Sequence, residues 1–240
     1  MSIVTDVTTS PPPPRPLWRR VTGSAWFHLI AAFLVFGLLL TFVAKPYLVP
    51  SGSMEPTLQP GDRVLVNRLA YVGTEPTTGD VIVFDASAAW DSTPRPDEPW
   101  WKQAARWVGE VSGFGPSGPH TLIKRVIAGP GQVVECCGAT GELTVDGIAL
   151  DEPYIQANFP YEEGVLDCST EPMSLRCFDA VEVPEGSYLV LGDNRSNSSD
   201  SAAHCRGASG DESCWRWATR DGVVGKATVI FWPVGRWGGL

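Results

Sequence analysis

The sequence predicts a mainly β protein that carries a single transmembrane helix near its N-terminus. Residues 25–44 form a 20-residue run without a formal charge, which is the length that a bilayer-crossing helix needs. From residue 61 onward the apolar runs are short and separated by turns, as in antiparallel sheets. The 25 glycines and 21 prolines also suit a turn-rich β protein. We therefore expect an anchor followed by an antiparallel β-sheet core with a smaller inserted β subdomain.

The N-terminal part of the chain is expected to comprise a disordered tail, residues 1–23, and an anchor, residues 24–45. The tail contains four consecutive prolines and has too few apolar residues for a core. A cleaved signal peptide is the alternative interpretation of the apolar run. The run is longer than the apolar region of such a peptide, and Lys45-Pro46 is a poor context for cleavage. These features favour an uncleaved anchor.

The distribution of charge predicts an orientation and excludes one class of partner. Arg19 and Arg20 lie just before the apolar run, and this arrangement is typical of a cytoplasmic N-terminus. The whole chain has a formal net charge of −9, which argues against nucleic acid as a partner. We expect a single-pass protein of the cytoplasmic membrane, with the lipid bilayer as a partner and the domain after the anchor on the outer side.

The strand signals after residue 60 come in order along the chain. Short apolar runs bounded by turn residues occupy residues 63–69, 81–84, 121–127, 142–145, 187–191 and 227–232. We expect residues 46–134 and 186–240 to form the main β core. Residues 135–185 contain four of the six cysteines and are expected to form the inserted subdomain.

A second unusual segment, residues 86–118, is rich in Pro, Gly and Trp. Its tryptophans are Trp90, Trp100, Trp101 and Trp107. Two interpretations are open: the rings form small cores of their own, or they enter the membrane interface, where tryptophan is favoured.

The cysteines predict disulfides rather than a metal site. All six lie after residue 135: Cys136, Cys137, Cys168, Cys177, Cys205 and Cys214. The later pairs are spaced too widely for a zinc knuckle, and His204 is the only histidine near any of them. Disulfides indicate an oxidising compartment. We favour Cys168–Cys177 and Cys205–Cys214, because each would close one short loop; the partners of Cys136 and Cys137 stay open, and no metal is expected.

Residues 49–62 form a proline-bounded turn with two serines, Ser51 and Ser53. Pro50 and Pro56 restrict the backbone on either side, and Gly52 allows close approach to another group. Such a turn can present a hydroxyl group in one orientation. It can equally be an ordinary loop, since a serine nucleophile needs a base from elsewhere in the chain.

The candidate base is Lys124. The histidines lack an aspartate in an obvious supporting position; they are His28, His120 and His204. On a strand, Leu122, Lys124 and Val126 share one face, so apolar side chains flank the lysine. Burial would lower its pKa from ~10.4 toward neutrality and let the amine accept a proton. The alternative is a lysine that extends to the surface beside Arg125.

Three stretches in one order resemble the sequence boxes of bacterial type I signal peptidases. They are PSGSMEPTLQPGD at residues 50–62, KRV at 124–126 and GDNRSNSSDS at 192–201, and they follow an N-terminal anchor. With the anchor and strand core, the resemblance covers roughly half of the chain. It implies a membrane-bound serine endopeptidase with a Ser-Lys dyad, without a metal or another cofactor.

The resemblance also implies a role for each matching residue. Ser53 would be the nucleophile and Lys124 the general base. Ser51 would donate its hydroxyl to the oxyanion hole, and Ser198 would orient the lysine amine. Supports around the dyad would be Asp193, Arg125 and Asp200. Shallow pockets for small side chains at P1 and P3 of preprotein signal peptides would be lined by Tyr47, Val49, Met54, Leu58, Leu122 and Ile123.

Two positions depart from the pattern of the resembled family. Ala202 stands where an arginine is usual two residues after Asp200, so a support for Asp200 is missing or Arg206 replaces it. Ser196 stands where an aspartate is common.

Two other classes of protein are alternatives to a signal peptidase. Self-cleaving repressors share Ser-Lys chemistry, but this sequence shows no evident DNA-binding domain and does contain an anchor. A disulfide-stapled binding domain is the non-enzymatic alternative, and a desolvated Lys124 argues against it.

Overall fold

The computed structural model describes residues 22–86, 90, 99–102, 121–138, 140–207 and 212–240. Within it the chain divides into two compact units, Met1–Leu39 and Leu40–Leu240. Several expectations lie outside the described residues: the disordered tail, Trp107, His120 and most of segment 86–118.

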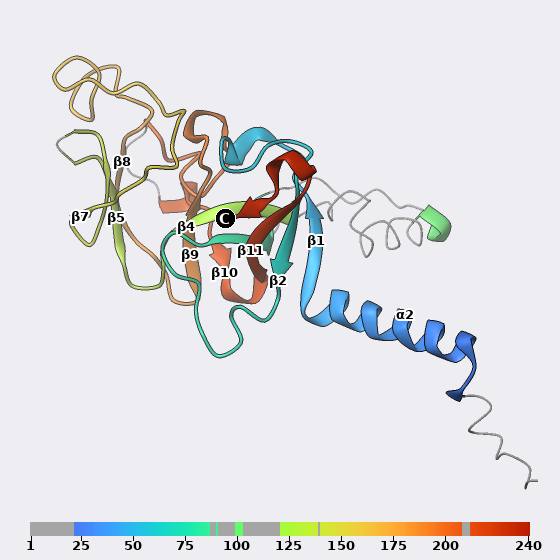
Figure 1. Cartoon of the computed structure of the whole chain (residues 1–240). Helices are drawn as coiled ribbons and strands as arrows, with labels where there is room; N and C mark the ends of the chain where they lie inside the picture. Colours follow the sequence, from blue (N-terminus) through green and yellow to red (C-terminus); the bar gives the residue numbers. More distant parts are fainter. Residues whose placement is uncertain (1–21, 87–89, 91–98, 103–120, 139, 208–211) are drawn as a thin grey trace, which may run out of the picture. The chain divides into compact units, whose positions relative to one another are not determined.

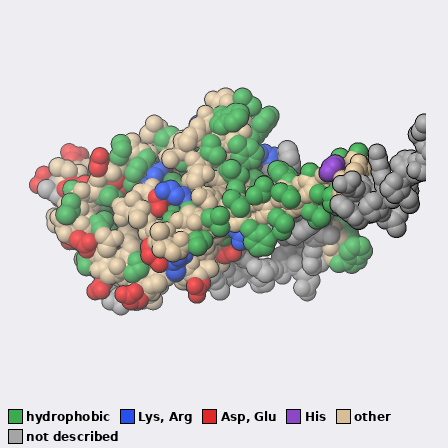
Figure 2. All heavy atoms as spheres, turned by 60° about the horizontal axis from the view of Figure 1, so that its bottom comes forward, with side chains coloured by type: hydrophobic (Ala, Val, Ile, Leu, Met, Phe, Trp, Pro, Cys, Tyr) green, Lys and Arg blue, Asp and Glu red, His purple; other side chains and the backbone are tan. Residues whose placement is uncertain are grey.

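The only long helix among the described residues is α2, Ala25–Phe42. It contains 18 residues, and neither its first turn nor its last turn carries a charged side chain of the kind that helix ends favour. Large apolar side chains such as Trp26, Phe33 and Leu34 are exposed, and Figure 2 shows the hydrophobic side chains that cover the helix. No helix in the described part of the chain is long and apolar enough to cross a membrane. The transmembrane helix stays a prediction.

The large sheet has eight antiparallel strands and carries the candidate site (Figure 1). Its order is β1-β2-β11-β3-β4-β9-β10, with β12 paired to β11. The bounds are β1 Ala44–Leu48, β2 Arg63–Asn67, β3 Val81–Asp85, β4 Thr121–Ala128, β9 Ser187–Leu191, β10 Ala218–Thr219, β11 Val223–Trp232 and β12 Gly238–Gly239. Short 3-10 helices lie between them, of which η1, Gly52–Met54, and η2, Arg195–Asn197, matter for the site.

The small sheet has four antiparallel strands in the order β7-β6-β5-β8. Its bounds are β5 Val133–Cys136, β6 Leu143–Val145, β7 Ile148–Ala149 and β8 Phe178–Glu182. The expectation of a mainly β fold with antiparallel sheets is therefore confirmed. Each of the six predicted strand segments contains a strand, although the segment 63–69 ends at Asn67. There the side chain of Asn67 accepts a hydrogen bond from the Leu69 amide, and the ladder stops.

Both faces of the large sheet are buried, and β3 shows why. Val81 and Val83 pack into one hydrophobic cluster, with Val64 and Met54, on one face. Ile82 and Phe84 pack into a second cluster on the other face. A strand buried on both faces reads as a continuous apolar run, as β3 does here. A third cluster joins the two sheets, and its members include Ile127, Leu189, Leu191, Val134, Leu143 and Phe178.

Of the tryptophans described in segment 86–118, Trp90 belongs to this core. Trp90 packs edge-to-face against Phe84 and donates a hydrogen bond from Nε1 to the Trp217 carbonyl at 2.9 Å. Trp90 is therefore buried in the core of the large sheet and not in a small core of its own. Trp100 and Trp101 are exposed.

Three disulfides are present. Cys168–Cys177 and Cys205–Cys214 confirm the predicted pairs. The pairing that the sequence left open is Cys136–Cys137, a bond between neighbours in the chain.

Candidate active site

The turn that carries Ser53 is held by backbone hydrogen bonds at its ends and by two side chains that pack into the core. The Val49 amide donates to the Asp62 carbonyl at 2.8 Å, and the Gly61 amide donates to the Val49 carbonyl at 2.9 Å, which closes the loop. Met54 and Leu58 are fully buried in the core of the large sheet. The 3-10 turn η1 therefore holds Ser53 on a rigid base, with its side chain toward β4.

Strand β4 places Lys124 against Ser53. The lysine pairs with Ile82 of β3 in the middle of the sheet, and its side chain is 3 % exposed. Its Nζ lies 2.7 Å from Ser53 Oγ, which is hydrogen-bond distance. These two residues are 71 positions apart in the chain, and the sheet brings together the pair that the sequence proposed.

Burial lowers the pKa of Lys124 to about 8, against the opposing attraction of Asp200 and Asp193. The low-dielectric surroundings disfavour the ammonium form, while the two carboxylates favour it. The net result is an amine that loses its proton at mildly alkaline pH. A neutral amine next to a hydroxyl can act as a general base.

Asp193 is held in a rigid clamp beside the dyad. Arg125 donates from Nε to Oδ1 at 2.8 Å and from Nη2 to Oδ2 at 2.6 Å, and Thr57 Oγ1 donates to Oδ2 at 2.5 Å. A bidentate arginine–carboxylate pair fixes geometry as well as charge. The clamp joins β4, the serine turn and the loop after β9, so it sets the relative position of the three stretches.

Arg206 takes the place of the arginine that the sequence lacks at Ala202. Its Nη2 lies 3.5 Å from Asp200 Oδ1, and both side chains are buried. Asp200 also accepts hydrogen bonds from the amides of Gly192 and Ala202, each at 3.3 Å. The sequence left two alternatives, a missing support for Asp200 or its replacement by Arg206, and the structure shows Arg206 paired with Asp200.

Ser198 lies next to the dyad without a hydrogen bond in the described residues. Its Oγ is buried and has no partner there. A Cβ on Gly192 would lie 2.3 Å from Ser198 Oγ and 2.4 Å from the Ser53 carbonyl oxygen, so only glycine fits between them. The expected hydrogen bond from Ser198 to the lysine amine stays a prediction.

A small cavity opens beside Ser53. It measures about 30 Å³ and is lined by Leu48, Val49, Pro50, Ser51, Ser53, Met54, Thr121, Leu122, Ile123 and Lys124. Four of the six residues predicted to line substrate pockets are in this lining, as is Ser51. Tyr47 and Leu58 are not; both are buried in the core cluster of the large sheet. Leu48, Pro50 and Thr121 also line the cavity, although the sequence did not predict them to line a substrate pocket.

Asn194 is a contact that sequence reasoning missed. Its amide donates to the Ser53 carbonyl at 3.0 Å, and its side-chain amide donates to the Gly52 carbonyl at 3.2 Å. Both bonds hold the backbone of the serine turn. The position lay within the third stretch of the resemblance, but its amide side chain carried no signal of a partner 142 residues earlier.

Segment 152–157, from the part of the chain predicted to be a subdomain, also supports the site. The Arg125 guanidinium lies 3.9 Å from the centre of the Tyr154 ring. Tyr154 donates to Glu152 at 3.0 Å, and Glu152 pairs with Arg195. The Arg195 amide donates to the Ala157 carbonyl at 2.9 Å. The clamp around Asp193 therefore has a second layer, and no motif in this segment could have revealed it.

Arg236, near the C-terminus, holds the far end of the serine turn. Its Nε donates to Asp62 Oδ1 at 2.9 Å, and its Nη2 donates to the Thr57 carbonyl at 3.1 Å. Asp62 in turn accepts from the Gln59 amide at 2.8 Å. The turn is thus bound by side chains from three separate parts of the chain.

Sequence comparisons with known proteins identify one family. The family described as "Signal peptidase, peptidase S26" matches residues 23–232. Signal peptidase I of Mycobacterium tuberculosis is 39 % identical over 234 residues, which cover 94 % of this chain and 77 % of that protein. Signal peptidase IB of Staphylococcus aureus is 31 % identical over 214 residues, which cover 87 % of this chain and 88 % of that protein. A crystal structure of a signal peptidase I from Enterococcus faecalis is 22 % identical with a TM-score of 0.34, and covers 65 % of this chain and 98 % of that one.

Proposed function

The chain belongs to the S26 family of signal peptidases, and from this premise we propose that it is a membrane-bound serine endopeptidase that removes signal peptides from exported preproteins. One observation carries the proposal: the 2.7 Å contact between Ser53 Oγ and the buried Nζ of Lys124. A hydroxyl and a desolvated amine at this distance have the arrangement of a nucleophile and its base.

Lys124 acts first as a general base and then as a general acid. In its neutral form the amine takes the proton from Ser53 Oγ as the oxygen attacks the scissile carbonyl. The resulting ammonium returns a proton to the leaving amine, and an acyl-enzyme remains. A water molecule, deprotonated by the same amine, then hydrolyses the ester. A pKa of about 8 leaves the two protonation states close in free energy, which suits both roles.

Ser51 and the Ser53 amide form the oxyanion hole in this proposal. Ser51 lies in the lining of the cavity that also contains Ser53 and Lys124, and this position supports the assignment. Donors aimed at the developing negative charge stabilise the transition state more than the ground state. Ser198 orients the lysine amine, supported by the position of its Oγ next to the Ser53 carbonyl.

The small cavity selects small side chains at P1, and the adjoining surface does so at P3. The cavity is small, about 30 Å³, and its lining is largely apolar. Val49, Met54, Leu122 and Ile123 supply apolar walls, while Tyr47 and Leu58 pack behind them and set their positions. Exclusion of larger groups by rigid walls is the physical basis of such a preference.

The apolar N-terminal segment holds the enzyme at the cytoplasmic membrane, with the domain after it outside. The exposed apolar side chains of α2 and the arginines before the segment support this part of the proposal. Disulfides support an oxidising compartment for the domain after the segment. A preprotein held in the same bilayer meets the site at a raised effective concentration.

The test is cleavage of a model preprotein by the full chain in detergent. Ser53→Ala and Lys124→Ala should each abolish cleavage while the circular dichroism spectrum stays that of the wild type. The double variant should be no worse than either single, because the two residues act as a unit. Lys102→Ala, which removes an exposed lysine, is the matched control and should cleave normally. Substantial cleavage by folded Lys124→Ala would remove the lysine as the base.

A further inference from the structure

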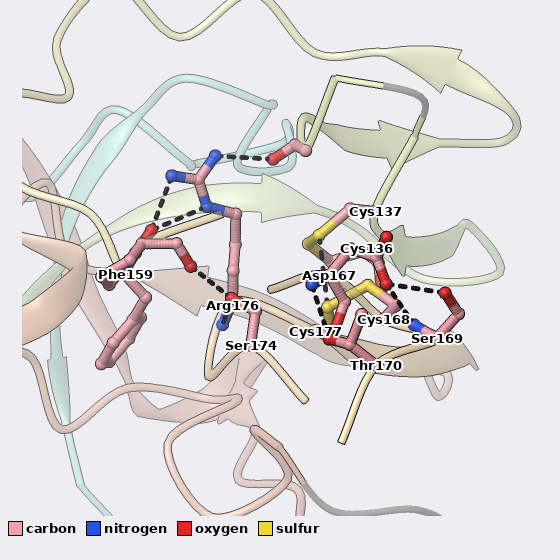
Figure 3. Close-up of a disulfide and its surroundings, with 12 residues drawn as sticks. Cys136, Cys137, Phe159, Asp167, Cys168, Ser169, Thr170, Ser174, Arg176 and Cys177 are labelled. Atoms are coloured by element: carbon pink, nitrogen blue, oxygen red, sulfur yellow. Dashed lines mark hydrogen bonds between the residues drawn. A yellow bond between two sulfur atoms is a disulfide. The ribbon is translucent and has the colours of Figure 1, made fainter. Parts of the chain in front are cut away.

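Four cysteine sulfurs gather where β5 ends and β8 begins in the small sheet (Figure 3). Cys137 Sγ lies 4.0 Å from Cys177 Sγ, although each belongs to a different disulfide. The sulfurs of Cys137, Cys168 and Cys177 all lie within 4.8 Å of one another. Cys136 is bonded to Cys137, and its carbonyl oxygen lies 3.8 Å from Cys168 Sγ. Two disulfides are therefore in van der Waals contact.

The fold holds the two disulfides in this contact. Cys136 ends β5 and pairs in register with Phe178 of β8, so the sheet places Cys177 beside the first pair. Arg176, next to Cys177, donates to the Phe159 carbonyl at 2.6 Å and to the Gly141 carbonyl at 3.1 Å. Asp167, next to Cys168, accepts from the amides of Gly164 at 2.6 Å and Ser169 at 2.7 Å. Both arms of the second disulfide are anchored by their neighbours, as Figure 3 shows for the side chains it labels.

Each disulfide has one buried and one partly exposed cysteine. Cys136 and Cys177 are buried, while Cys137 and Cys168 are partly open to solvent. A thiolate in solution can attack a disulfide only at a sulfur it can reach. An external thiol therefore has access to Cys137, and Cys137 in turn faces Cys177, which solvent does not reach.

We propose that Cys136, Cys137, Cys168 and Cys177 form a thiol–disulfide exchange site that takes a dithiol as its reductant. In the first step the dithiol attacks Cys137, forms a mixed disulfide and releases the Cys136 thiol. The second thiol of the reductant then resolves the mixed disulfide. The dithiol leaves as a disulfide, two electrons have passed to the protein, and Cys136 and Cys137 are both thiols.

In the second step the reduced Cys137 opens the other disulfide, Cys168–Cys177. The Cys137 thiolate attacks Cys177 Sγ, its near neighbour at 4.0 Å, and a Cys137–Cys177 bond forms as the Cys168–Cys177 bond breaks. Cys168 leaves as a thiolate and takes a proton from water, so no further oxidant or reductant is needed. Cys168 is the partly exposed member of its pair, and solvent stabilises its thiolate as the leaving group.

The third disulfide supplies an internal control. Cys205–Cys214 has the same sequence separation of nine residues as Cys168–Cys177, and it also pairs a buried cysteine with a partly exposed one. Among the described residues, Cys137, Cys168 and Cys177 are the only cysteines in a three-membered group, so Cys205 and Cys214 have no third sulfur beside them. The loop closed by Cys168–Cys177 therefore has a neighbouring cysteine that can donate a thiol, and the loop closed by Cys205–Cys214 does not.

The first test compares two variants that leave one thiol each. Full-length Cys136→Ser and Cys137→Ser are purified in detergent, alkylated with N-ethylmaleimide and mapped by peptide mass spectrometry without reduction. In Cys136→Ser the free Cys137 thiol should exchange, so that a Cys137–Cys177 peptide appears together with alkylated Cys168. In Cys137→Ser the Cys168–Cys177 bond should persist. Retention of Cys168–Cys177 alone in both variants would overturn the proposal, and so would equal exchange in both.

The second test uses the wild-type chain, whose pairing is native before the reaction starts. One equivalent of dithiothreitol at pH 8 should give a Cys137–Cys177 peptide with Cys136 and Cys168 alkylated and Cys205–Cys214 intact. In excess dithiothreitol, Cys168–Cys177 should open about tenfold faster than in the Cys136→Ser/Cys137→Ser double variant, because the attack is intramolecular. Cys205–Cys214 should open equally fast in both proteins. Absence of the Cys137–Cys177 peptide, or equal opening rates of Cys168–Cys177, would overturn the proposal.

Discussion

The two sheets of this protein reach stability by different means. The large sheet buries side chains on both faces, and residues such as Val83, Phe84 and Val126 have no exposed surface. The small sheet leaves β7 fully exposed and buries only alternate residues of β5. Two of the three disulfides lie at the small sheet. A sheet with too little apolar surface to bury depends on covalent links, whereas the two-faced core does not.

This difference explains where the candidate dyad lies. A lysine loses its proton near neutral pH only where the surroundings exclude water, and Lys124 is 3 % exposed in the middle of the large sheet. The small sheet offers no comparable position in its described strands, because its buried residues face one side only. The two regions still cooperate, since Tyr154 and Glu152 brace the clamp that Arg125 makes on Asp193.

The largest expected effect comes from replacing Lys124 by methionine, which removes the amine but leaves a buried side chain of similar length. Lys124→Met should lower kcat by about 10⁴-fold or more, as expected when the base is lost. The same change should raise the free energy of unfolding at pH 7 by about 1–3 kcal/mol, because it removes the cost of desolvating an ammonium group. Preprotein cleavage and urea unfolding in detergent measure the two quantities. Loss of activity together with loss of stability would contradict the view that the buried lysine is costly.

The next effect concerns the oxyanion hole that we propose at Ser51. Ser51→Ala should lower kcat by ~10²–10³ with little change in KM, since the hydroxyl acts chiefly when charge develops on the carbonyl oxygen. Ser51→Thr keeps the hydroxyl and should retain much more activity if the added methyl fits. Steady-state cleavage of a signal-peptide substrate gives kcat and KM for both variants and distinguishes them. A wild-type kcat in Ser51→Ala would return this residue to the role of an ordinary loop serine.

The smallest effect on activity is expected from the small sheet. Replacing both Cys168 and Cys177 by alanine should lower the free energy of unfolding by about 2–3 kcal/mol, as the loss of a short-loop disulfide does. The value of kcat should stay within about threefold of the wild type, because neither cysteine contacts the site. Thermal unfolding and cleavage at a temperature well below the transition make the comparison. A loss of activity as large as that of Ser51→Ala would show that the small sheet contributes to catalysis and not only to stability.

Five of the six strands predicted from sequence belong to the large sheet, and the sixth, residues 142–145, contains β6 of the small sheet. β3, β4, β9 and β11 are rich in Val, Ile and Leu. In β3 and β9 the apolar run is continuous because both faces of the strand are buried. The sequence missed β1, where Lys45 and Pro46 obscure the pattern; an edge strand tolerates proline because one side needs no partner. It also missed β5 and β8, in which exposed acidic residues such as Glu135 and Asp179 interrupt short runs.

The candidate site was predictable where residues carry recognisable chemistry and unpredictable where they act through distant contacts. Ser53 and Lys124 were candidates because they are a turn serine and a lysine within an apolar strand, and the resemblance to type I signal peptidases favoured them over an ordinary loop serine and a surface lysine. Arg236 reaches Asp62 across 174 positions, and Asn194 reaches Gly52 across 142. Nothing in the local sequence specifies such pairs, because the topology of the sheet creates them.

The pH dependence of stability follows from the same burial and has a definite sign. The pKa of Lys124 is about 8 in the folded protein and ~10.4 in an unfolded chain. Between these values the unfolded chain binds more protons, so stability rises with pH across this window. The full cost of the buried lysine is present below pH 8. Lys124→Met should therefore lose this rise, and its gain over the wild type should shrink above pH 8.

The most direct test of the account is the pH profile of kcat/KM for preprotein cleavage. If neutral Lys124 is the base, activity should be low at pH 6 and should rise through an apparent pKa near 8. The measurement needs the full chain in detergent and a substrate whose own groups do not titrate between pH 6 and pH 10. A rising limb centred near ~6.5, the value of a free histidine, would contradict the account and require a base other than Lys124.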